Sequence, residues 1–245
     1  RGLGDVYKRQ VYEDENILLV DKPVGMVVHE DESGDSDTLI NRIKSYLYHK
    51  GEYHPENELS FAPALCNRID RNTCGIVIAA KNAESLRILN QKIRDRELTK
   101  LYLCIACGKV TPDSATLTAY LEKNSDTNTV KISDKKTKSN LTIKTKYKVI
   151  AYNGENSLLK VDLLTGRTHQ IRAHLAYIGH ALLGDGKYGN NKLNKKYGFK
   201  YQALCSYELQ FKFTTDAGCL SYLDGKCFKA KAPDFVKMFG SNIKL

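Results

Sequence analysis

Residues 67–75 read Asn67-Arg68-Ile69-Asp70-Arg71-Asn72-Thr73-Cys74-Gly75, and the apolar run Ile76-Val77-Ile78-Ala79-Ala80 follows at once. The polar segment predicts a turn and the apolar run predicts a buried strand, so Asp70 is expected on a turn that leads directly into the core. Arginines lie on both sides of Asp70, and neighbouring positive charge keeps a carboxylate ionised. The stretch therefore predicts a nucleophile or a charge-bearing base.

On both sides of this turn the sequence predicts many short strands and few helices. Apolar runs predict strands at 11–13, 17–22, 75–80, 101–107, 116–121, 129–132, 141–150, 158–164 and 203–213. Helical spacing predicts helices at 38–50, 83–95, 168–177 and 233–239, and turn residues predict a hairpin at 217–231. Because strands outnumber helices and short turns join them, the predicted fold is one α+β domain with a mixed, mostly antiparallel central sheet flanked by helices and loops.

The whole chain is basic. Its 245 residues include 38 Lys and Arg against 28 Asp and Glu, which gives a net charge of +10 and a pI of about 9.1. The hydrophobic fraction of 42% is enough for one sizeable core. A basic folded chain most often binds a polyanion, and nucleic acid is the leading candidate; surface charge that serves only solubility is the alternative.

One predicted helix, at 83–95, has a basic side. Asn82 is its predicted N-cap, and Leu86, Leu89 and Ile93 are its predicted core-facing positions. The other face carries Arg87, Lys92, Arg94 and Arg96. This face is the first candidate for contacts with a nucleic-acid backbone, and a merely solvated face is the alternative.

Seven cysteines are scattered through the chain, at positions 66, 74, 104, 107, 205, 219 and 227. Their number is odd, the sequence shows no secretory signal, and no apolar run approaches the length of a membrane span. A reducing, cytoplasmic compartment without membrane association is therefore expected. Cys104 and Cys107 lie in one predicted strand and point to opposite faces, so we expect buried thiols rather than a zinc or redox site.

A second informative segment reads Leu163-Leu164-Thr165-Gly166-Arg167-Thr168-His169-Gln170-Ile171-Arg172-Ala173-His174-Leu175. A strand is expected to end at Gly166, and a helix to begin with Thr168 as its cap. Arg167 then lies beside free backbone N–H groups, with His169 and Arg172 on one helical turn, which suits a phosphate or a carboxylate. The alternative is a helix whose arginines pair with internal acids.

Two further side-chain patterns bear on the chemistry. His169 and His174 are five residues apart, which places them on different helix faces, and no acidic or cysteine partner is close in sequence, so no metal site is expected. On strand 101–107, Tyr102 shares a face with Cys104 and Ala106. Its ring either fills core volume or stacks on a base and uses its hydroxyl in proton transfer.

Three ordered motifs resemble the RluA-type pseudouridine synthase family, which includes uridine isomerases of ribosomal large subunit RNA. The first is Arg68-Ile69-Asp70-Arg71-x-Thr73-x-Gly75 before an apolar strand, and the second is Gly166–Leu175 with Leu183-Gly184-Asp185-x-x-Tyr188-Gly189 after it. The third is the early run Asp21-Lys22-Pro23-x-Gly25, followed by Val28-His29. The similarity covers residues 11 to 240 approximately. Asn67 stands where the family usually has His, and Cys74 where it often has Ser.

The resemblance implies a pseudouridine synthase catalytic domain over residues 11–245 that isomerises specific uridines in structured RNA without cofactor or metal. Ribosomal RNA is the first expected substrate, transfer RNA is the second, and a monomer is expected. Many family members carry a small RNA-binding domain ahead of the catalytic one. Residues 1–10 lack a starting methionine and clear periodicity, so they are expected to be a non-native or truncated remnant, with the upstream domain missing.

The resemblance also implies residue roles. Asp70 is the implied catalytic carboxylate, and the sequence leaves open whether it attacks C1′ or removes the 2′ proton. Arg167 is the implied cation paired with Asp70, and Tyr102 is the ring that stacks on the uracil and accepts the C5 proton. Arg68 is implied to fill the gap left by the flipped base or to hold its phosphate, and Ile171 to act as an apolar lid that excludes water.

Arg172 and His169 complete the expected RNA contacts, because they lie beside Arg167. A non-catalytic RNA-binding module is the main alternative, and it explains the charge but not the set of Asp70, Arg167 and Tyr102. A nucleotide or nucleoside hydrolase is a second alternative, since it too breaks a C–N bond with one carboxylate. A metal-dependent nuclease fits least, because no carboxylate cluster for two metals is apparent.

Overall fold

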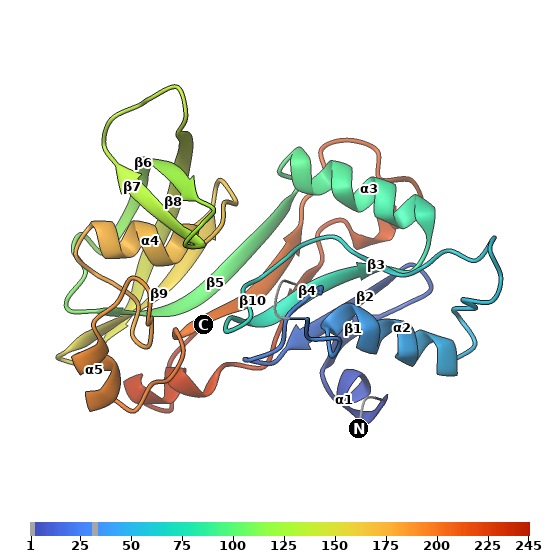
Figure 1. Ribbon diagram of the computed structural model, residues 1–245, viewed down its shortest axis with the longest axis horizontal. Coiled ribbons are helices and arrows are strands. Elements are labelled where there is room, and N and C mark those ends of the chain that lie inside the picture. Colours follow the sequence, from blue (N-terminus) through green and yellow to red (C-terminus); the bar gives the residue numbers. More distant parts are fainter. Residues whose placement is uncertain (1–2, 31–33) are drawn as a thin grey trace. The chain divides into compact units, whose positions relative to one another are not determined.

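The computed structural model of the chain describes residues 3–30 and 34–245 (Figure 1). They form two compact units, one made of Arg1–Lys100 and Ser206–Lys231 and the other of Leu101–Cys205 and Ala232–Leu245. Antiparallel strands dominate both units and helices cover them. The predicted α+β class with a mostly antiparallel sheet is confirmed.

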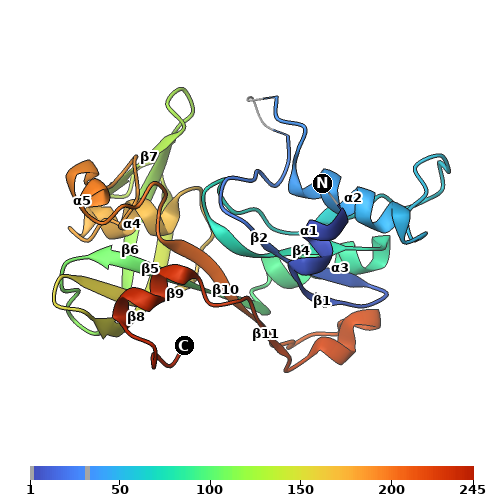
Figure 2. The same cartoon turned by 90° about the horizontal axis from the view of Figure 1, so that it is seen from below.

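In the first unit the spatial order of the main strands is β1 (Gln10–Glu13), β2 (Ile17–Lys22), β4 (Cys74–Ala80) and β10 (Leu204–Phe211). The short strands β3 (Ala64–Leu65) and β11 (Cys227–Lys229) pair antiparallel with β4 and β10. Helix α3 (Ala83–Arg94) lies on one side of these strands, and α1 (Leu3–Lys8) and α2 (Leu39–His49) lie on the other (Figures 1 and 2).

Strands β2 and β4 are the centre of this unit, and their sequences show why. Residues 17–20 and 76–80 are all at most 2% exposed. A strand covered on both faces has no solvent side to alternate with, so its sequence is continuously apolar. The polar turn that contains Asp70 is therefore attached directly to a strand that is buried along almost its whole length.

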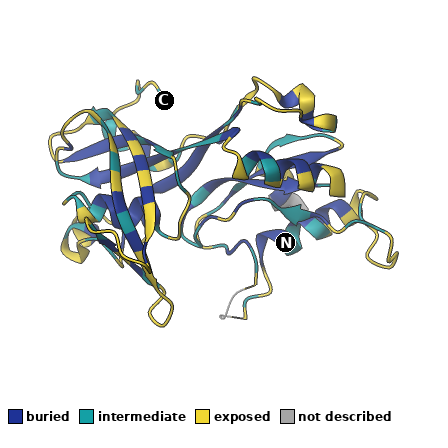
Figure 3. Cartoon of the chain, turned by 90° about the horizontal axis from the view of Figure 1, so that it is seen from above, coloured by how far each residue is buried: buried dark blue, intermediate teal, exposed yellow. Residues whose placement is uncertain are grey.

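In the second unit the spatial order is β5 (Leu98–Cys107), β9 (Asn156–Leu163), β8 (Leu141–Tyr152), β6 (Ser114–Asn124) and β7 (Thr129–Ser133). Each neighbouring pair is antiparallel. Helix α4 (Gln170–Tyr177) covers one face, where Ala173 joins a core of Ala119, Leu121, Val130, Ile132 and Ile143. Along β6 and β8 burial alternates residue by residue over much of each strand, because successive side chains point to opposite faces of the sheet (Figure 3).

Two smaller helices complete the second unit. Helix α5 (Asn191–Lys196) has no counterpart among the predicted elements. The predicted helix at 233–239 is present as the 3₁₀-helix η2 (Asp234–Phe239), whose Phe235 and Met238 pack against the cluster of Ile105, Leu183 and Ala203.

The N-cap of α3 was predicted correctly, but the faces of this helix were not. The Asn82 side chain accepts a hydrogen bond from the Ser85 amide at 2.9 Å, as expected for an N-cap. The buried positions of α3 are Ser85, Ile88, Leu89 and Lys92. Lys92 is fully buried, and its charge is tolerated there because the ammonium donates to Glu97 Oε2 at 2.8 Å. The other three residues of the predicted basic face, Arg87, Arg94 and Arg96, are exposed.

The predicted hairpin at 217–231 is wrong. Gly218–Leu223 form the 3₁₀-helix η1, and only Cys227–Lys229 is a strand, which pairs with β10. Leu220 and Leu223 are both fully buried and lie three residues apart, which is the period of a 3₁₀-helix. Burial of these two leucines favours the 3₁₀-helix over the hairpin that the turn residues predicted.

Residues 3–10 take part in the fold, although they were left out of the predicted domain. Leu3–Lys8 form α1, and Val6 is 2% exposed. The Asp21 amide donates to the carbonyl of Arg9 at 2.8 Å. That residues 1–10 are a non-native remnant, with a domain missing upstream, stays a prediction.

Gly75 is the joint between the Asp70 turn and β4, and no side chain fits there. Its φ is +113°, and an added Cβ would lie 2.1 Å from the carbonyl oxygen of Ser206. We expect Gly75→Ala to lower the free energy of unfolding by about 3 kcal/mol, since backbone strain and a backbone clash add. Urea denaturation measures this loss. Gly154→Ala is the control, because Gly154 has φ +94° with open space around it and should lose only about 1 kcal/mol; equal losses would contradict the clash.

Candidate active site

The Asp70 turn (residues 67–75) is held in place by its own side chains and backbone. The side chain of Asn67 is buried, and its Oδ1 accepts from the Ile78 amide at 2.8 Å, which ties the start of the turn to β4. Ile69 is 8% exposed, and the Thr73 amide donates to the Asp70 carbonyl at 3.0 Å. Asp70 itself is half-buried between these anchors. A carboxylate so placed has a defined position and still reaches the surface.

A second segment, residues 22–26, holds the far side of the turn. The Lys22 ammonium and the Gly25 amide both donate to the Arg71 carbonyl, each at 2.9 Å. No role was predicted for Lys22, although a charged residue at the end of an apolar strand is a signal that sequence reasoning can use. The backbone immediately after Asp70 is thus fixed by one donor from the end of β2 and one from the loop after it.

The two arginines that flank Asp70 differ in their surroundings. Arg68 is exposed. Burial of the His29 ring lowers the pKa of this histidine, and the positive charge of Arg68 lowers it further. Arg71 is half-buried, and its Nη1 lies 3.7 Å from Asp35 Oδ2. Arg68 is therefore the more exposed of the two arginines that flank Asp70.

In the second unit Tyr102 lies near the middle of β5 and is 6% exposed. It pairs with Val161 of β9 and shares its face with the fully buried Cys104 and Ala106, as predicted from the strand period. Its stacking and proton-transfer roles stay predictions.

The joint between β9 and α4 is organised by Gln170, which was not predicted to have a role. Gln170 is 2% exposed. Its Oε1 accepts from the Arg167 amide at 3.1 Å and from Thr165 Oγ1 at 2.9 Å. Its Nε2 donates to the Lys144 carbonyl and to Thr145 Oγ1. This buried amide sets the backbone of Arg167, whose own side chain is exposed.

The predicted cap of α4 is wrong. The helix begins at Gln170, and His169 occupies the N-cap position in a left-handed conformation, with φ 52° and no side-chain cap. His169 therefore lies before the helix and does not share its turn with Arg172. Its Nδ1 lies 2.8 Å from the Tyr188 hydroxyl, which also accepts from the Val130 amide.

Arg172 has its partner inside the protein. Its Nε lies 2.7 Å from Asp185 Oδ2 and its Nη2 3.0 Å from Asp185 Oδ1, and both side chains are buried. The sequence left open whether the arginines of this helix bind an external anion or pair with internal acids. Arg172 pairs with an internal acid. Two of the five N–H groups of the guanidinium are engaged by Asp185 in this way. The RNA contact expected of Arg172 stays a prediction.

Ile171 and His174 also lie within the second unit. Ile171 is 3% exposed in the first turn of α4. His174 is 1% exposed, its Nδ1 lies 2.8 Å from Thr145 Oγ1, and burial lowers its pKa to about 4, so its ring is neutral. Among the described residues no group of three or more His, Cys, Asp or Glu could hold a metal ion, and none of the helices there is long and apolar enough to cross a membrane.

The predicted site residues fall into two groups. Asp70 and Arg68 belong to the first unit, and the others, Tyr102, Arg167, His169, Ile171 and Arg172, belong to the second. The pairing of Asp70 with Arg167 stays a prediction.

Known proteins are similar to most of this chain. The family model described as RNA pseudouridylate synthase matches residues 16–177. An uncharacterized RNA pseudouridine synthase of Mycoplasma genitalium is 38% identical over 208 residues, which cover 82% of this chain and 62% of the relative. The ribosomal large subunit pseudouridine synthase D of Borreliella burgdorferi is 34% identical over 180 residues, which cover 73% of this chain and 54% of the relative. The chain thus spans little more than half the length of these curated relatives.

Solved structures show the same fold. Human RNA pseudouridylate synthase domain containing 4 superposes with a TM-score of 0.74 at 18% identity, covering 95% of this chain and 92% of the human one. Human RNA pseudouridylate synthase domain containing 1 gives a TM-score of 0.66 at 20% identity, with 96% of both chains covered.

Proposed function

Because the chain belongs to the RNA pseudouridylate synthase family, we propose that it isomerises uridine to pseudouridine in RNA, and that ribosomal RNA is its substrate. The observation that carries this proposal is Asp70, a half-buried carboxylate whose turn is anchored on both sides by buried donors. The name of the Borreliella burgdorferi relative supports the choice of ribosomal RNA. Transfer RNA is the alternative substrate within the same activity.

The reaction requires a base that has left the helix stack, because C1′ and C5 of a stacked uridine are out of reach of a side chain. The C1′–N1 bond breaks, the uracil turns, and a C5–C1′ bond forms; the C5 proton leaves and N1 gains a proton. No electrons are exchanged with an outside group, so no cofactor is needed. Asp70 acts at the sugar, as nucleophile at C1′ or as base at the 2′ position.

The remaining roles in this proposal follow the family resemblance. Arg167 balances the charge of Asp70, and its exposed side chain on a fixed backbone suits that role. Tyr102 stacks on the uracil and accepts the C5 proton. Exposed Arg68 takes the place of the flipped base or holds its phosphate, and Ile171 keeps water from the detached base.

The net charge of +10 supports a polyanionic partner. We expect RNA affinity to fall steeply as salt concentration rises, because each neutralised phosphate releases counterions. Arg87 and Arg94 are the exposed arginines of α3. Replacing both with Gln should reduce the slope of log affinity against log salt by about 1 for each lost phosphate contact. Filter binding at several salt concentrations measures it.

Lys237→Gln is the control for this series, since its ammonium already pairs with Asp234 at 2.7 Å in an exposed ion pair. It should leave the salt slope unchanged. A wild-type affinity that does not depend on salt would rule out the phosphate contacts altogether.

The activity is tested with the purified chain and unmodified transcripts of ribosomal and transfer RNA. Nucleoside mass spectrometry and mapping of pseudouridine by reverse-transcription stops should show pseudouridine at defined positions of ribosomal RNA. Release of free uracil would instead identify a hydrolase, and binding without any change in the nucleosides would identify a non-catalytic RNA-binding module. Modification of transfer RNA alone would correct the substrate class.

We also propose that the protein acts as a monomer in the cytoplasm. All seven cysteines are free thiols, which supports a reducing compartment. Sedimentation of the purified chain tests the oligomeric state.

A further inference from the structure

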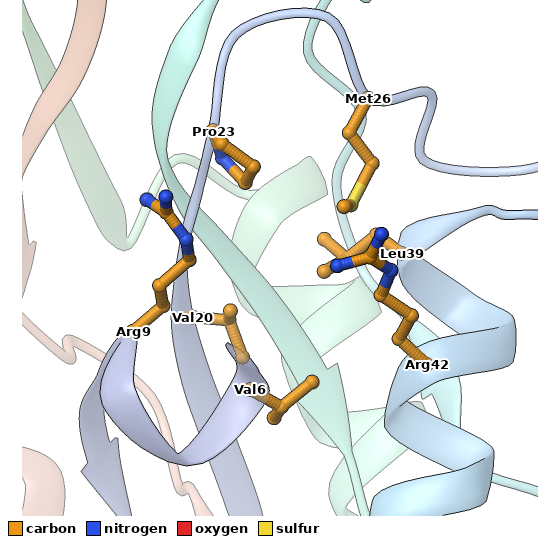
Figure 4. Close-up of a pocket in the computed structure, with 7 residues that line it drawn as sticks. All are labelled: Val6, Arg9, Val20, Pro23, Met26, Leu39 and Arg42. Atoms are coloured by element: carbon orange, nitrogen blue, oxygen red, sulfur yellow. The ribbon is translucent and has the colours of Figure 1, made fainter. Parts of the chain in front are cut away.

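The first unit contains a small hollow between Arg9 and Arg42 (Figure 4). Its volume is about 10 Å³, which is room for a water at most. The apolar side chains that line it come from α1, α2, β2 and the loop after β2: Val6, Leu39, Val20, Pro23 and Met26. A macromolecular partner cannot enter this hollow and must use the surface of the protein.

The second unit has a row of lysines on strand β8. Lys144, Lys146 and Lys148 are exposed. They alternate with Thr145 and Tyr147, which are buried. Alternate side chains of a strand point to the same side of the sheet, so the three ammonium groups lie in one row, about 7 Å apart along the strand. This spacing is close to that of successive phosphate groups in an RNA strand.

Hydroxyl groups of β6 accompany this row. Each of the three lysines lies directly opposite an exposed hydroxyl residue in the register of β6 and β8: Lys148 opposite Ser114, Lys146 opposite Thr116, and Lys144 opposite Thr118. Residues directly opposite each other project from the same face of a sheet. Ammonium and hydroxyl groups both donate hydrogen bonds to phosphate oxygens. These six residues are called the lysine face below.

Neighbouring charges relieve little of the repulsion within the row. On the side of β9, Lys148 lies opposite Lys160 and Lys146 lies opposite Asp162. Like charges directly opposite each other destabilise a sheet. Among the residues that the structure describes, none of the three lysines of the row forms an ion pair. The charge of the row therefore favours a partner that is negatively charged along its length.

The lysine face is on the opposite side of the sheet from Tyr102. Tyr102 pairs with Val161 of β9, and Val161 pairs with Tyr147 of β8, so these three residues share a face. Lys146 and Lys148 flank Tyr147 in the strand and point the other way. A nucleotide that stacks on Tyr102 is therefore out of reach of the lysine face, and a partner bound there is a different segment of RNA.

The composition of the lysine face indicates which kind of RNA it fits. Its side chains are lysines, threonines and a serine, and none of the six carries an aromatic ring on which an unpaired base could stack. Lysine and hydroxyl contacts with phosphates position a nucleic acid without reading its sequence. Double-stranded RNA presents phosphates on its outside, with its bases turned away, and so fits this face better than a single strand.

We propose that the lysine face binds the phosphate backbone of a double-stranded RNA segment that lies outside the target nucleotide. This inference rests on the proposed function for the choice of RNA, and it deepens that function by assigning a second contact with the substrate. The lysine face provides affinity and takes no part in the chemical step. Its contribution requires an RNA large enough to reach both faces of the sheet.

The first experiment measures binding of the full chain to an RNA duplex of about 20 base pairs, by filter binding at several salt concentrations. The variant Lys144→Gln, Lys146→Gln, Lys148→Gln should bind this duplex about 30-fold more weakly than wild type. Its slope of log affinity against log salt should be smaller by about 3, one for each lost phosphate contact.

The matched control is Lys192→Gln, Lys195→Gln, Lys200→Gln, which removes the same number of exposed positive charges from the same unit, in and after α5. It should bind the duplex within threefold of wild type. Equal weakening by both triple variants would mean that net charge alone acts, and would overturn the proposal. A duplex affinity of the Lys144, Lys146 and Lys148 variant within threefold of wild type overturns it as well.

The second experiment measures single-turnover pseudouridine formation. With a long ribosomal RNA transcript, the Lys144, Lys146 and Lys148 variant should need about 30-fold more protein for half-maximal rate, while the rate at saturation stays within threefold of wild type. With a short stem-loop cut around the modified uridine, both quantities should match those of wild type. An equal effect on the stem-loop, or a lower rate at saturation, overturns the assignment to a segment outside the target.

A single-stranded RNA of the same length separates the two forms of backbone. If its affinity depends on the three lysines as strongly as that of the duplex, the choice of a duplex is wrong. A wild-type chain that forms no pseudouridine but binds the duplex through these lysines refutes the proposed function and supports this inference. Pseudouridine formation without any dependence of duplex affinity on the lysines gives the reverse result.

Discussion

Replacement of Asp70 by Asn is expected to abolish pseudouridine formation while RNA affinity stays within a few fold of wild type. Asn has nearly the shape of Asp, so the turn held by Asn67, Thr73 and Lys22 keeps its geometry. It lacks the negative charge that a nucleophile or base needs at the sugar. A loss of at least 10⁴-fold in single-turnover rate is expected, of the order seen when an essential catalytic group is removed.

Asp95→Asn is the matched control, since Asp95 is an exposed carboxylate at the end of α3, 3.8 Å from Arg94 Nε. It should leave the rate unchanged, as measured by tritium release from C5-labelled RNA. Turnover by Asp70→Asn close to that of wild type would remove Asp70 from the mechanism. A loss of both turnover and RNA affinity would point to binding rather than to chemistry.

Replacement of Arg172 by Met is expected to lower the free energy of unfolding by about 3–5 kcal/mol, because Asp185 is left as an unpaired buried charge. The Asp185 side chain is fully buried, and among the residues that the structure describes its other donors are the amides of Lys187 and Tyr188, at 2.8 and 3.0 Å. Met fills a similar volume without a charge. Urea denaturation followed by circular dichroism measures the loss.

The double variant Arg172→Met with Asp185→Leu is the control, since replacing both charges by apolar groups removes the unpaired carboxylate. It should recover most of the lost stability. If the single variant is as stable as wild type, the ion pair contributes nothing to the fold. An additive loss in the double variant would mean that Asp185 acts through its other bonds.

The stability of the wild type and that of the double variant should also respond differently to a fall in pH. Burial alone would raise the pKa of Asp185, but Arg172 and the amides of Tyr188 and Lys187 outweigh it and lower the pKa below its ordinary value. A carboxylate of this kind adds stability above its unfolded pKa and loses it as the pH falls through the folded pKa. The wild type should therefore lose more stability than the double variant between pH 5 and the acid limit, by urea denaturation at each pH.

Arg172 and Asp185 also show what the second motif does not reveal. Both residues lie in segments that resemble the family, and the sequence analysis assigned the arginine to RNA. Thirteen residues separate them, and nothing in local periodicity indicates that they meet. The loop between α4 and Tyr188 brings them together, and burial then requires that each charge be paired.

The strands were more predictable than the surroundings of the charged residues. Continuous apolar runs placed β2 and β4 almost to the residue, because strands buried on both faces tolerate few polar side chains. Lys92 was assigned to a solvent-facing side of α3 and is fully buried, since its partner Glu97 lies beyond the end of the helix. A helical period cannot show a partner outside the helix.

The amino-acid sequence by itself determined the α+β class, the position of Asp70 on a turn before the central strand β4, and the family, because these depend on local patterns and ordered motifs. Only the tertiary structure decided which charges are buried and what they hold: Arg172 on Asp185, Lys92 on Glu97, and Lys22 on the carbonyl after Asp70. The physical reason is that a buried charge must find partners wherever the chain brings them, and those partners are set by folding rather than by spacing along the sequence.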